Sequence, residues 1–402
     1  MPRRAKKQTT TPMNKETPKY WRLSLILTLC SAMVISACSN RYISAEKDSV
    51  SIIADTVWAF AQSHPDGFTL DICTMTKPTG GIAVSYAETK NSHSRNQLDK
   101  VVSHALKHDG FVGGWQNSEN GLYYFDSTKL FPETLLKEAI QFGKENGQLS
   151  VFILSTYSEI PIDGKVAEIV ERGTILVGTT GDYRPLSFRK SDGEYWGFGI
   201  EIAKEIASYL GVEAVFVQTS WPTLTDDVLA EPQIFDIAIG GITITDTRRE
   251  TMLMSEGYLA NGKTILCRSS EAGHFRSLTD IDKPEVRVMV NPGGLNEQFA
   301  NDNLTHATII VHPKNEEIPS LVAEGEADVM ITEITEAPYY IETDPRLAAP
   351  LLNEPFTHGE IGVLMQKDKE DLLQMVNNKI QIMKANGTLR RLHEKYGLVY
   401  AY

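Results

Sequence analysis

Glu333 and Glu336 end the stretch 327–336, which reads Ala-Asp-Val-Met-Ile-Thr-Glu-Ile-Thr-Glu. Its apolar run predicts a short buried strand, and Thr335 with Pro338 predicts a capped helix start directly after it. In an open α/β sheet, ligands bind where a strand ends and a helix begins. That position makes the two carboxyl groups candidates for chemistry, and proton transfer is the chemistry that a carboxyl group performs. The alternative is a pair of solvated acids in a strand–helix loop.

The composition describes an acidic globular protein. The chain has 402 residues, enough for two or three domains, and its 42% hydrophobic content is ordinary for a folded protein. Residues 1–37 contain seven basic residues and one acidic residue, so the rest of the chain has 32 basic and 51 acidic residues, a net charge of −19. Such a charge excludes binding to nucleic acid or to an anionic membrane by bulk electrostatics.

The N-terminus resembles a bacterial lipoprotein signal peptide, which we assign to residues 1–37. Basic residues up to Arg22 precede a short apolar run that ends in Ile35-Ser36-Ala37-Cys38. The resemblance implies that Cys38 becomes the lipidated N-terminus and anchors the protein in the periplasm or at the cell surface. An uncleaved membrane anchor is the alternative, although the run is short for a spanning helix. Met13 remains a second candidate for the start of translation.

Two of the four cysteines remain once the signal and the lipid site are set aside. Cys73 and Cys267 are expected in different domains, as buried small hydrophobic residues. No Cys-x-x-Cys motif or histidine cluster indicates a metal site, and we expect no metal and no cofactor.

Residues 50–172 predict a small α+β domain. The expected helices are 50–62, 96–108 and 132–146, and the expected strands are 67–73, 82–86, 111–116, 122–125 and 149–154. A linker at 155–173 ends in a short helix at about 165–172. The aromatic and histidine residues of this domain, His104, His108, Trp115, Tyr123 and Tyr124, are interpreted as core rather than as a site.

Residues 174–402 alternate strands with helices, a pattern typical of parallel α/β sheets with helices on both faces. The expected strands are 175–179, 213–218, 237–239, 286–290, 308–311, 328–331 and 360–365, and the expected helices are 200–210, 224–229, 296–300, 318–323, 372–385 and 389–396. The chain leaves one lobe near 265 and returns near 360. We therefore expect two lobes, one made of about 174–265 with 360–402 and one of about 266–359.

This region, from about 174 to 398, resembles the periplasmic solute-binding proteins of the polar amino-acid type. The motifs that carry the resemblance are Val177-Gly178-Thr179-Thr180-Gly181-Asp182-Tyr183-Arg184-Pro185-Leu186, Gly197-Phe198-Gly199-Ile200-Glu201-Ile202-Ala203, Phe235-Asp236-Ile237-Ala238-Ile239-Gly240-Gly241-Ile242-Thr243-Ile244-Thr245-Asp246-Thr247-Arg248-Arg249 and Asn386-Gly387-Thr388-Leu389. The resemblance implies the two-lobed type II fold, in which two hinge strands join the lobes and the ligand lies in the cleft between them. It also implies that Thr243 and Arg248 bind a ligand carboxylate, which the planar fork of an arginine suits. A surface ion pair is the alternative role for Arg248.

A narrower set of motifs is similar to the cyclohexadienyl dehydratases, exported enzymes built on this fold. These motifs are Thr219-Ser220-Trp221-Pro222-Thr223-Leu224, Asn261-Gly262-Lys263-Thr264, Asn291-Pro292-Gly293-Gly294-Leu295-Asn296-Glu297 and Thr332-Glu333-Ile334-Thr335-Glu336. The similarity implies loss of water and CO₂ from prephenate or arogenate, giving phenylpyruvate or phenylalanine. It further implies a cleft that binds a small carboxylate substrate and is lined by Tyr183, Trp221, Gly241, Asn296 and Glu333.

Glu336 separates the two families in function. Amino-acid-binding relatives have an acid at the position of Glu333, which holds the ligand ammonium, and a small residue or proline at the position of Glu336. The dehydratases have a glutamic acid there, as this chain does, and a departing hydroxide needs a general acid. The pKa of Glu336 must then be raised, by burial, by Glu333 and by the substrate carboxylates, against the effect of a helix N-terminus.

Three residues depart from these patterns. The dehydratases have threonine in place of Leu295 and aspartate in place of Glu333, and the wider family has aspartate in place of Gly199. Asn296, Asn291 and the amides of Gly293-Gly294 remain candidates for an anion-binding nest.

The alternative function is a lipid-anchored amino-acid-binding protein that serves an ABC permease, because the same fold supports both activities. A third class, an anchored interaction protein that works through residues 50–172, has no motif behind it.

Overall fold

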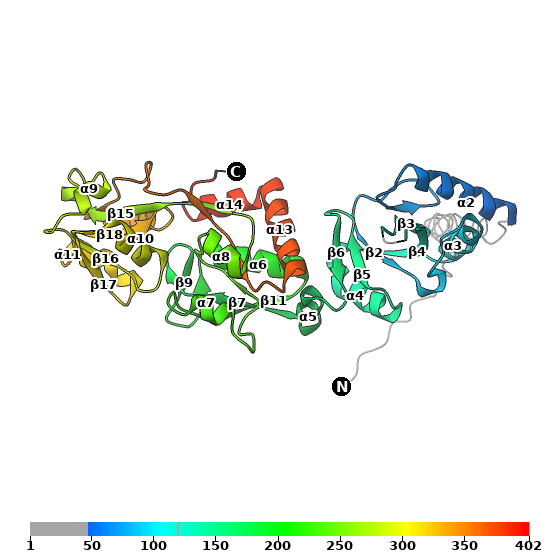
Figure 1. Cartoon of the computed structure of the whole chain (residues 1–402), viewed down its shortest axis with the longest axis horizontal. Helices are drawn as coiled ribbons and strands as arrows, with labels where there is room; N and C mark the ends of the chain where they lie inside the picture. The colour runs from blue at the N-terminus through cyan, green and yellow to red at the C-terminus, as the bar shows by residue number, and fades with distance from the viewer. Residues whose placement is uncertain (1–46, 119, 402) are drawn as a thin grey trace, which may run out of the picture. The chain divides into compact units, whose positions relative to one another are not determined.

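The computed structural model describes residues 47–118 and 120–401 (Figure 1). The predicted signal peptide, Cys30 and Cys38 lie outside the described residues. Internal contacts divide the chain into two units, one comprising Thr89–Thr128 with the described residues before Pro78, and the other comprising Pro78–Glu88 with the residues from Lys129 onward. None of the helices in the described ranges is both long and apolar enough to cross a membrane. The predicted domain boundaries themselves stay a prediction.

The first unit packs two helices on an antiparallel sheet. The helices are α2 (Lys47–Gln62) and α3 (Arg95–Lys107), and the strands are β1 (Phe68–Asp71), β3 (Phe111–Gln116) and the part of β4 (Tyr123–Phe131) up to Thr128. Helix α3 begins where the side chain of Ser94 accepts the amide of Gln97. The core joins Leu70 and Phe125 of the sheet to Leu98 of α3. Trp115, predicted to be core, is 47% exposed, because it lies on the opposite face of the sheet from Phe125.

The second unit begins with the strand order β4-β2-β5-β6, with β2 (Ile82–Ser85), β5 (Ser150–Ile153) and β6 (Ser158–Pro161). Helix α4 (Leu136–Glu145) follows a 3-10 turn at Glu133–Leu135, so the helix starts later than predicted. The predicted linker contains β6, which pairs with β5. This strand has only two buried residues, Ser158 and Ile160, and it ends in a proline, so no alternating pattern marks it. Helix α5 (Lys165–Arg172) has the predicted range.

Lobe 1 is built on the sheet order β11-β7-β12-β21-β13. Its strands are β7 (Thr174–Thr179), β11 (Glu213–Gln218), β12 (Ile237–Ala238), β13 (Leu253–Met254) and β21 (Leu364–Met365), and its helices are α6 (Phe198–Leu210), α7 (Leu224–Val228), α8 (Asp246–Thr251), α13 (Glu370–Ala385) and α14 (Thr388–Lys395). A small sheet adds β8 (Asp182–Tyr183), β9 (Ser187–Arg189) and β10 (Tyr195–Trp196). The C-terminal helices α13 and α14, red in Figure 1, return against α6. Helix α6 buries Ile202, Ile206 and Leu210, four residues apart, and ends at Gly211 in the left-handed conformation.

Lobe 2 is built on the sheet order β17-β16-β18-β15-β19. Its strands are β15 (Lys263–Arg268), β16 (Arg287–Val290), β17 (Thr308–Val311), β18 (Val329–Glu333) and β19 (Leu347–Ala348), and its helices are α9 (Leu278–Ile281), α10 (Leu295–Asn303), α11 (Ile318–Glu324) and α12 (Ala337–Thr343), with 3-10 turns η3 (Ser269–Glu271) and η4 (Asn315–Glu317). Strand β18 is buried along its whole length, as predicted, because it lies between β16 and β15.

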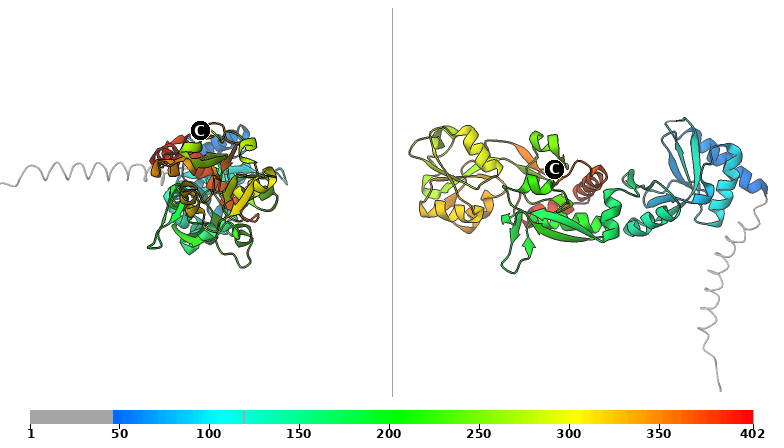
Figure 2. Two further views of the ribbon diagram at one scale, coloured as in Figure 1. Left: turned by 90° about the vertical axis from the view of Figure 1, so that its left-hand side faces the viewer. Right: turned by 60° about the horizontal axis from the view of Figure 1, so that its bottom comes forward.

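Two segments of chain connect the lobes: β14 (Leu259–Asn261), which leads into β15, and β20 (Gly359–Ile361), which returns to lobe 1. They pair with each other as an antiparallel ribbon. Figure 2 shows the yellow elements of lobe 2 and the green and red elements of lobe 1 as two bodies. The expected two-lobed type II fold is confirmed, although both sheets are mixed because β13, β15, β19 and β21 are antiparallel to their neighbours.

Two further local predictions were wrong. The N-cap of α12 is Glu336 and not Thr335, whose hydroxyl donates to the side chain of Asn261 instead. Both cysteines in the described residues are free, and Cys267 is buried, but Cys73 is exposed, because it lies in the turn after β1.

Candidate functional site

A cavity lies between the two lobes. It is lined by residues of lobe 1 (Tyr183, Trp221, Gly241, Thr243, Arg248) and by residues of lobe 2 (Lys263, Asn291, Gly294, Leu295, Asn296, Glu333). The structure therefore brings together all of the residues that were predicted to line the cleft. Lys263 was not predicted, and Glu336 does not belong to the lining.

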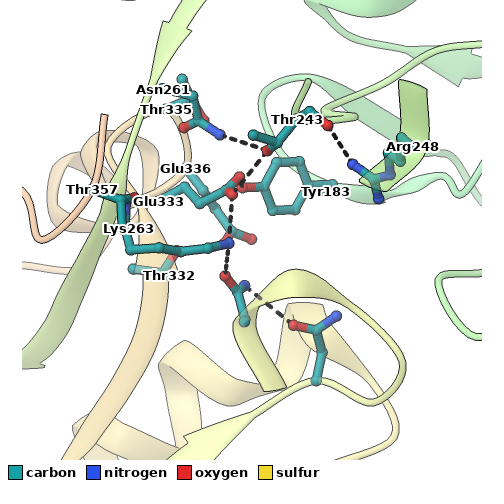
Figure 3. Close-up of polar contacts among 12 residues, drawn as sticks. Tyr183, Thr243, Arg248, Asn261, Lys263, Thr332, Glu333, Thr335, Glu336 and Thr357 are labelled. Carbon is teal, nitrogen blue, oxygen red and sulfur yellow. Dashed lines mark hydrogen bonds and ion pairs between the residues drawn. The ribbon is translucent and has the colours of Figure 1, made fainter. Parts of the chain in front are cut away.

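Lys263 and Glu333 form a buried ion pair on the lobe 2 side of the cavity (Figure 3). The two residues lie opposite each other in the antiparallel pairing of β15 with β18, and Nζ lies 2.7 Å from Oε1. Lys263 also donates to Oδ1 of Asn296 at 2.6 Å. Burial alone would raise the pKa of Glu333, but the charge of Lys263 and the hydrogen bonds from Lys263, Tyr183 and Asn261 outweigh it, so the pKa is lowered and the carboxylate stays ionised.

Two further side-chain contacts of Glu333 come from lobe 1. The hydroxyl of Tyr183 donates to Oε2, and the hydroxyl of Thr243 donates to Oε1 at 3.3 Å. Thr243, predicted to bind a ligand carboxylate, is thus turned toward a carboxylate of the protein and also accepts from Asn261 at 3.2 Å. The position of Tyr183 depends on Gly241, which has φ of 107° and whose Cβ, if present, would lie 2.5 Å from the tyrosine ring.

Arg248 enters the cavity from α8. The helix begins at Asp246, directly after its N-cap Thr245, whose side chain accepts the amide of Arg248 at 3.2 Å. The guanidinium donates through Nη1 to the backbone carbonyl of Thr243, its one side-chain hydrogen bond within the described residues (Figure 3). Burial lowers the pKa of Arg248, and the charge of Glu333 opposes that shift. A guanidinium has five N–H donors, so this arginine keeps donors for a carboxylate ligand.

Glu336 lies behind Glu333, at the start of α12, and is fully buried. Thr332 donates to its Oε2 at 2.5 Å, and Asn315 donates to its Oε1 at 2.7 Å. Burial raises the pKa of Glu336 to about 8 and outweighs these two hydrogen bonds, which lower it. Its carboxyl group is therefore mostly protonated at neutral pH. A raised pKa of this kind is what proton donation requires.

The other side of the cavity holds neutral groups. The indole of Trp221 donates to Oδ1 of Asp182 at 3.1 Å and meets the ring of Tyr183 edge to face at 5.6 Å. The predicted nest is partly filled, because the amide of Gly293 donates to the side chain of Glu297 at 2.6 Å. Leu295 places an apolar side chain at the start of α10, where the resemblance to the dehydratases implied a hydroxyl.

The charges of the cavity favour an anion. Arg248 and Lys263 supply two positive charges, whereas Glu333 supplies one negative charge that is already paired with Lys263. The described ranges contain no group of three or more His, Cys, Asp or Glu side chains that could hold a metal ion. The arrangement can bind carboxylates and can present a protonated carboxylic acid close behind the binding surface.

Comparison with known proteins identifies relatives of this region. Residues 175–399 match the model for bacterial extracellular solute-binding proteins, family 3. The chain is 38% identical over 234 residues to cyclohexadienyl dehydratase of Pseudomonas aeruginosa, an alignment that covers 58% of this chain and 86% of the relative. It is 30% identical over 237 residues to the L-cystine-binding protein TcyJ of Escherichia coli K12, which covers 58% of this chain and 86% of that one.

A solved structure agrees with these sequence matches. The ancestral amino acid-binding protein AncCDT-1, described as a precursor of cyclohexadienyl dehydratase, superposes with a TM-score of 0.54 at 36% identity. The match covers 58% of this chain and 99% of that protein. Relatives of both kinds, a dehydratase and amino-acid-binding proteins, therefore align with the same region.

Proposed function

Because this chain belongs to the bacterial extracellular solute-binding proteins of family 3, we propose that its cavity is the active site of a cyclohexadienyl dehydratase, with Glu336 as the general acid. The substrate is prephenate or arogenate, and the products are phenylpyruvate or phenylalanine, CO₂ and water. The reaction is that of a hydro-lyase and uses no cofactor.

One observation carries the proposal: the ion pair between Lys263 and Glu333. In an amino-acid receptor, the carboxylate at this position would receive the ammonium of the ligand. Here a lysine of the protein is 2.7 Å from that carboxylate, and the net charge left in the cavity is positive. This charge favours a ligand whose charged groups are carboxylates, and prephenate is a dicarboxylate.

The reaction needs one proton donor and one oriented carboxylate. The C–C bond to the ring carboxylate breaks and releases CO₂, the electron pair enters the ring, and the C–O bond to the ring hydroxyl breaks. Glu336 gives its proton to the departing oxygen, so water leaves and an aromatic ring remains. Arg248 binds a substrate carboxylate and orients the ring, and Trp221 and Tyr183 contact its faces. Glu336 is left ionised and regains a proton from solvent.

Glu336 is the best acid among the carboxyl groups near the cavity. Glu333 lines the cavity, but its pKa is lowered beside Lys263, so it holds no proton at neutral pH. Glu360 is exposed in β20. Glu336 has a raised pKa of about 8. Proton donation requires Oε2 to turn from Thr332 toward the cavity when substrate is bound, while Oε1 keeps the hydrogen bond from Asn315.

The second candidate is an amino-acid-binding protein that delivers its ligand to an ABC permease. The observation in its favour is that Arg248 and Glu333 line one cavity, since an arginine and an acid bind the two ends of a zwitterion. Amino-acid binding would need Lys263 to leave Glu333, which costs the energy of a buried pair. The dehydratase is therefore the better-supported function.

The same proposal includes export and anchoring. Cys38, at the end of the signal-like segment, is proposed as the lipidated residue that holds the protein on a membrane facing the periplasm or the exterior. Metabolic labelling with a fatty acid should mark the wild-type protein and leave Cys38→Ala unlabelled. Labelling of both proteins, or of neither, would remove the anchor from the proposal.

Turnover of prephenate tests the enzymatic proposal. The purified full chain without its signal peptide is expected to convert prephenate to phenylpyruvate, read by the absorbance of the enol in alkali. Titration calorimetry with the common amino acids is the parallel measurement, and weak or absent binding is expected. Absence of turnover together with tight binding of an amino acid would establish the receptor instead.

A further inference from the structure

Asn315 connects the two lobes to the acid of the site. It lies in η4 of lobe 2, and its side chain is 1% exposed. Its Nδ2 atom donates both to Oε1 of Glu336, at 2.7 Å, and to the backbone carbonyl of Asp182, at 3.2 Å. Asp182 begins β8 of lobe 1, so a single amide group contacts the opposite lobe and the carboxyl group that bears the proton.

The same contact between lobes buries Glu336. Strand β8 packs against η4, which places Asp182 and Tyr183 beside the acid. The titratable groups around the Glu336 carboxyl are Glu333 from β18, Asp182 and Tyr183 from β8, and Tyr340 from α12. If the lobes part, β8 moves away from η4, and Asn315 then loses the carbonyl that fixes its amide.

We propose that Asn315 is a positioning residue through which closing of the lobes sets the position of the Glu336 carboxyl group. The inference rests on the proposed role of Glu336 as the general acid. In the closed state the carbonyl of Asp182 orients the amide, and the amide in turn holds the carboxyl group at Oε1. The acid is therefore in its working position only while the lobes are closed.

An amide suits this position because it can serve both forms of the acid. Its N–H group donates to the carboxylate and also to the carbonyl oxygen of the protonated carboxyl group, so the bond to the Asp182 carbonyl is kept in both forms. Oδ1 of Asn315 is buried and has no hydrogen-bond partner within the described residues, so the hydrogen bonds that fix this side chain are those of Nδ2. A hydrocarbon side chain could not hydrogen-bond to Glu336 in either protonation state, and a carboxylate would repel the ionised carboxyl group of Glu336.

The test compares Asn315→Leu and Asn315→Asp with Arg184→Ala. Arg184 donates from lobe 1 to the hydroxyl of Tyr339 in lobe 2 at 2.8 Å, so its loss weakens closure without removing a bond to Glu336. Both Asn315 variants lose the N–H donor that lowers the pKa of Glu336. They should lower kcat for prephenate by roughly ten- to hundredfold, the effect of one hydrogen bond to a charged group, with a small change in KM.

The pH profile separates positioning from damage to the fold. The alkaline limb of kcat should move to higher pH in both Asn315 variants, because removing the donor raises the pKa of Glu336 further. Arg184→Ala should raise KM and leave the limb where it is. A lower kcat with an unmoved limb in both Asn315 variants, or unchanged kcat, would overturn the proposal.

A second measurement does not depend on turnover. The infrared band of the protonated Glu336 carboxyl group, assigned by its loss in Glu336→Gln, can be titrated with phenylpyruvate bound. The band should persist to higher pH in Asn315→Leu than in wild type. A shift of this band in a protein without turnover would support the link through Asn315 and contradict only the enzymatic proposal, whereas identical titrations would refute the link itself.

Discussion

The ammonium of Lys263 lies 2.7 Å from the carboxylate of Glu333, and both side chains are buried in the wall of the cavity. A buried carboxylate that is already paired has little to offer the ammonium of a ligand. The pair therefore supports the proposal that the ligand of the cavity has carboxylates as its charged groups.

The first prediction concerns the choice between the two proposed substrates. Arogenate carries an ammonium group where prephenate carries a keto group, and that ammonium would be buried near Arg248 and Lys263 without a free carboxylate. We expect kcat/KM to favour prephenate by at least about tenfold, the cost of one poorly paired polar group. Steady-state kinetics with both substrates measure the ratio. Equal values of kcat/KM, or a preference for arogenate, would contradict the view that Glu333 is occupied by Lys263 and cannot bind the ammonium of arogenate.

Lys263→Met should destabilise the protein and weaken prephenate binding together. Removing one partner leaves Glu333 buried and unpaired, which costs about 3–5 kcal/mol of folding free energy. Chemical denaturation measures this loss. The control is Lys190→Met, which breaks an exposed pair with Glu194 and should cost less than about 1 kcal/mol. Similar losses of unfolding free energy in both variants would mean that the buried pair stabilises the protein no more than the exposed pair does.

Arg248→Ala should impair substrate binding and orientation at once, so KM should rise and kcat should fall. The lost bidentate interaction with a carboxylate is worth a few kcal/mol, so kcat/KM should fall by about a hundredfold or more. Arg249→Ala is the matched control, because Arg249 is exposed on the same helix and does not line the cavity. Equal kcat/KM values for the two variants would contradict a role for Arg248 in binding the substrate.

Gly241→Ala should disturb the site through Tyr183. The added Cβ would lie 2.5 Å from the tyrosine ring, and the backbone at φ of 107° disfavours any side chain. We expect a loss of about 1–3 kcal/mol in stability from the backbone strain, with an additional loss of activity. Gly273→Ala, at a glycine with no atom within 4 Å of the new Cβ, should leave the melting temperature nearly unchanged. A melting temperature that fell equally in both variants would contradict this explanation.

Much of the fold follows from local patterns in the sequence. Long elements such as α13 and β11 have clear periodicity, and their ranges were predicted within a residue or two. The strands β6, β8 and β10 were not predicted, because two to four residues beside turns and prolines carry no period. The strand β15 was not predicted either. It pairs antiparallel with β18, and this pairing depends on how the chain crosses between the lobes rather than on a local pattern.

The site was only partly predictable for the same reason. Glu333 and Glu336 could be placed from the end of one strand, whereas the pairing of Lys263 with Glu333 joins residues 70 positions apart. Such a pair depends on the register of β15 against β18, which no local pattern specifies. The Asn261-Gly262-Lys263-Thr264 motif was the available signal, but its lysine was read only as part of a resemblance. Glu336 lies behind the cavity lining, where Asn315 and Thr332 hydrogen-bond to its carboxyl group. No local sequence pattern connects these two residues to Glu336.

The most direct test of Glu336 as the general acid is the turnover of prephenate by wild type and by Glu336→Gln. The glutamine keeps the shape of the side chain and one acceptor oxygen but cannot give a proton, so kcat should fall by about 10²–10⁴-fold while KM stays nearly constant. The wild-type rate should decline as the pH rises through about 8, because the raised pKa of Glu336 keeps the acid protonated below that pH and ionised above it. Near-normal turnover by Glu336→Gln would contradict the account and would make Glu333 and Glu360 the next residues to replace.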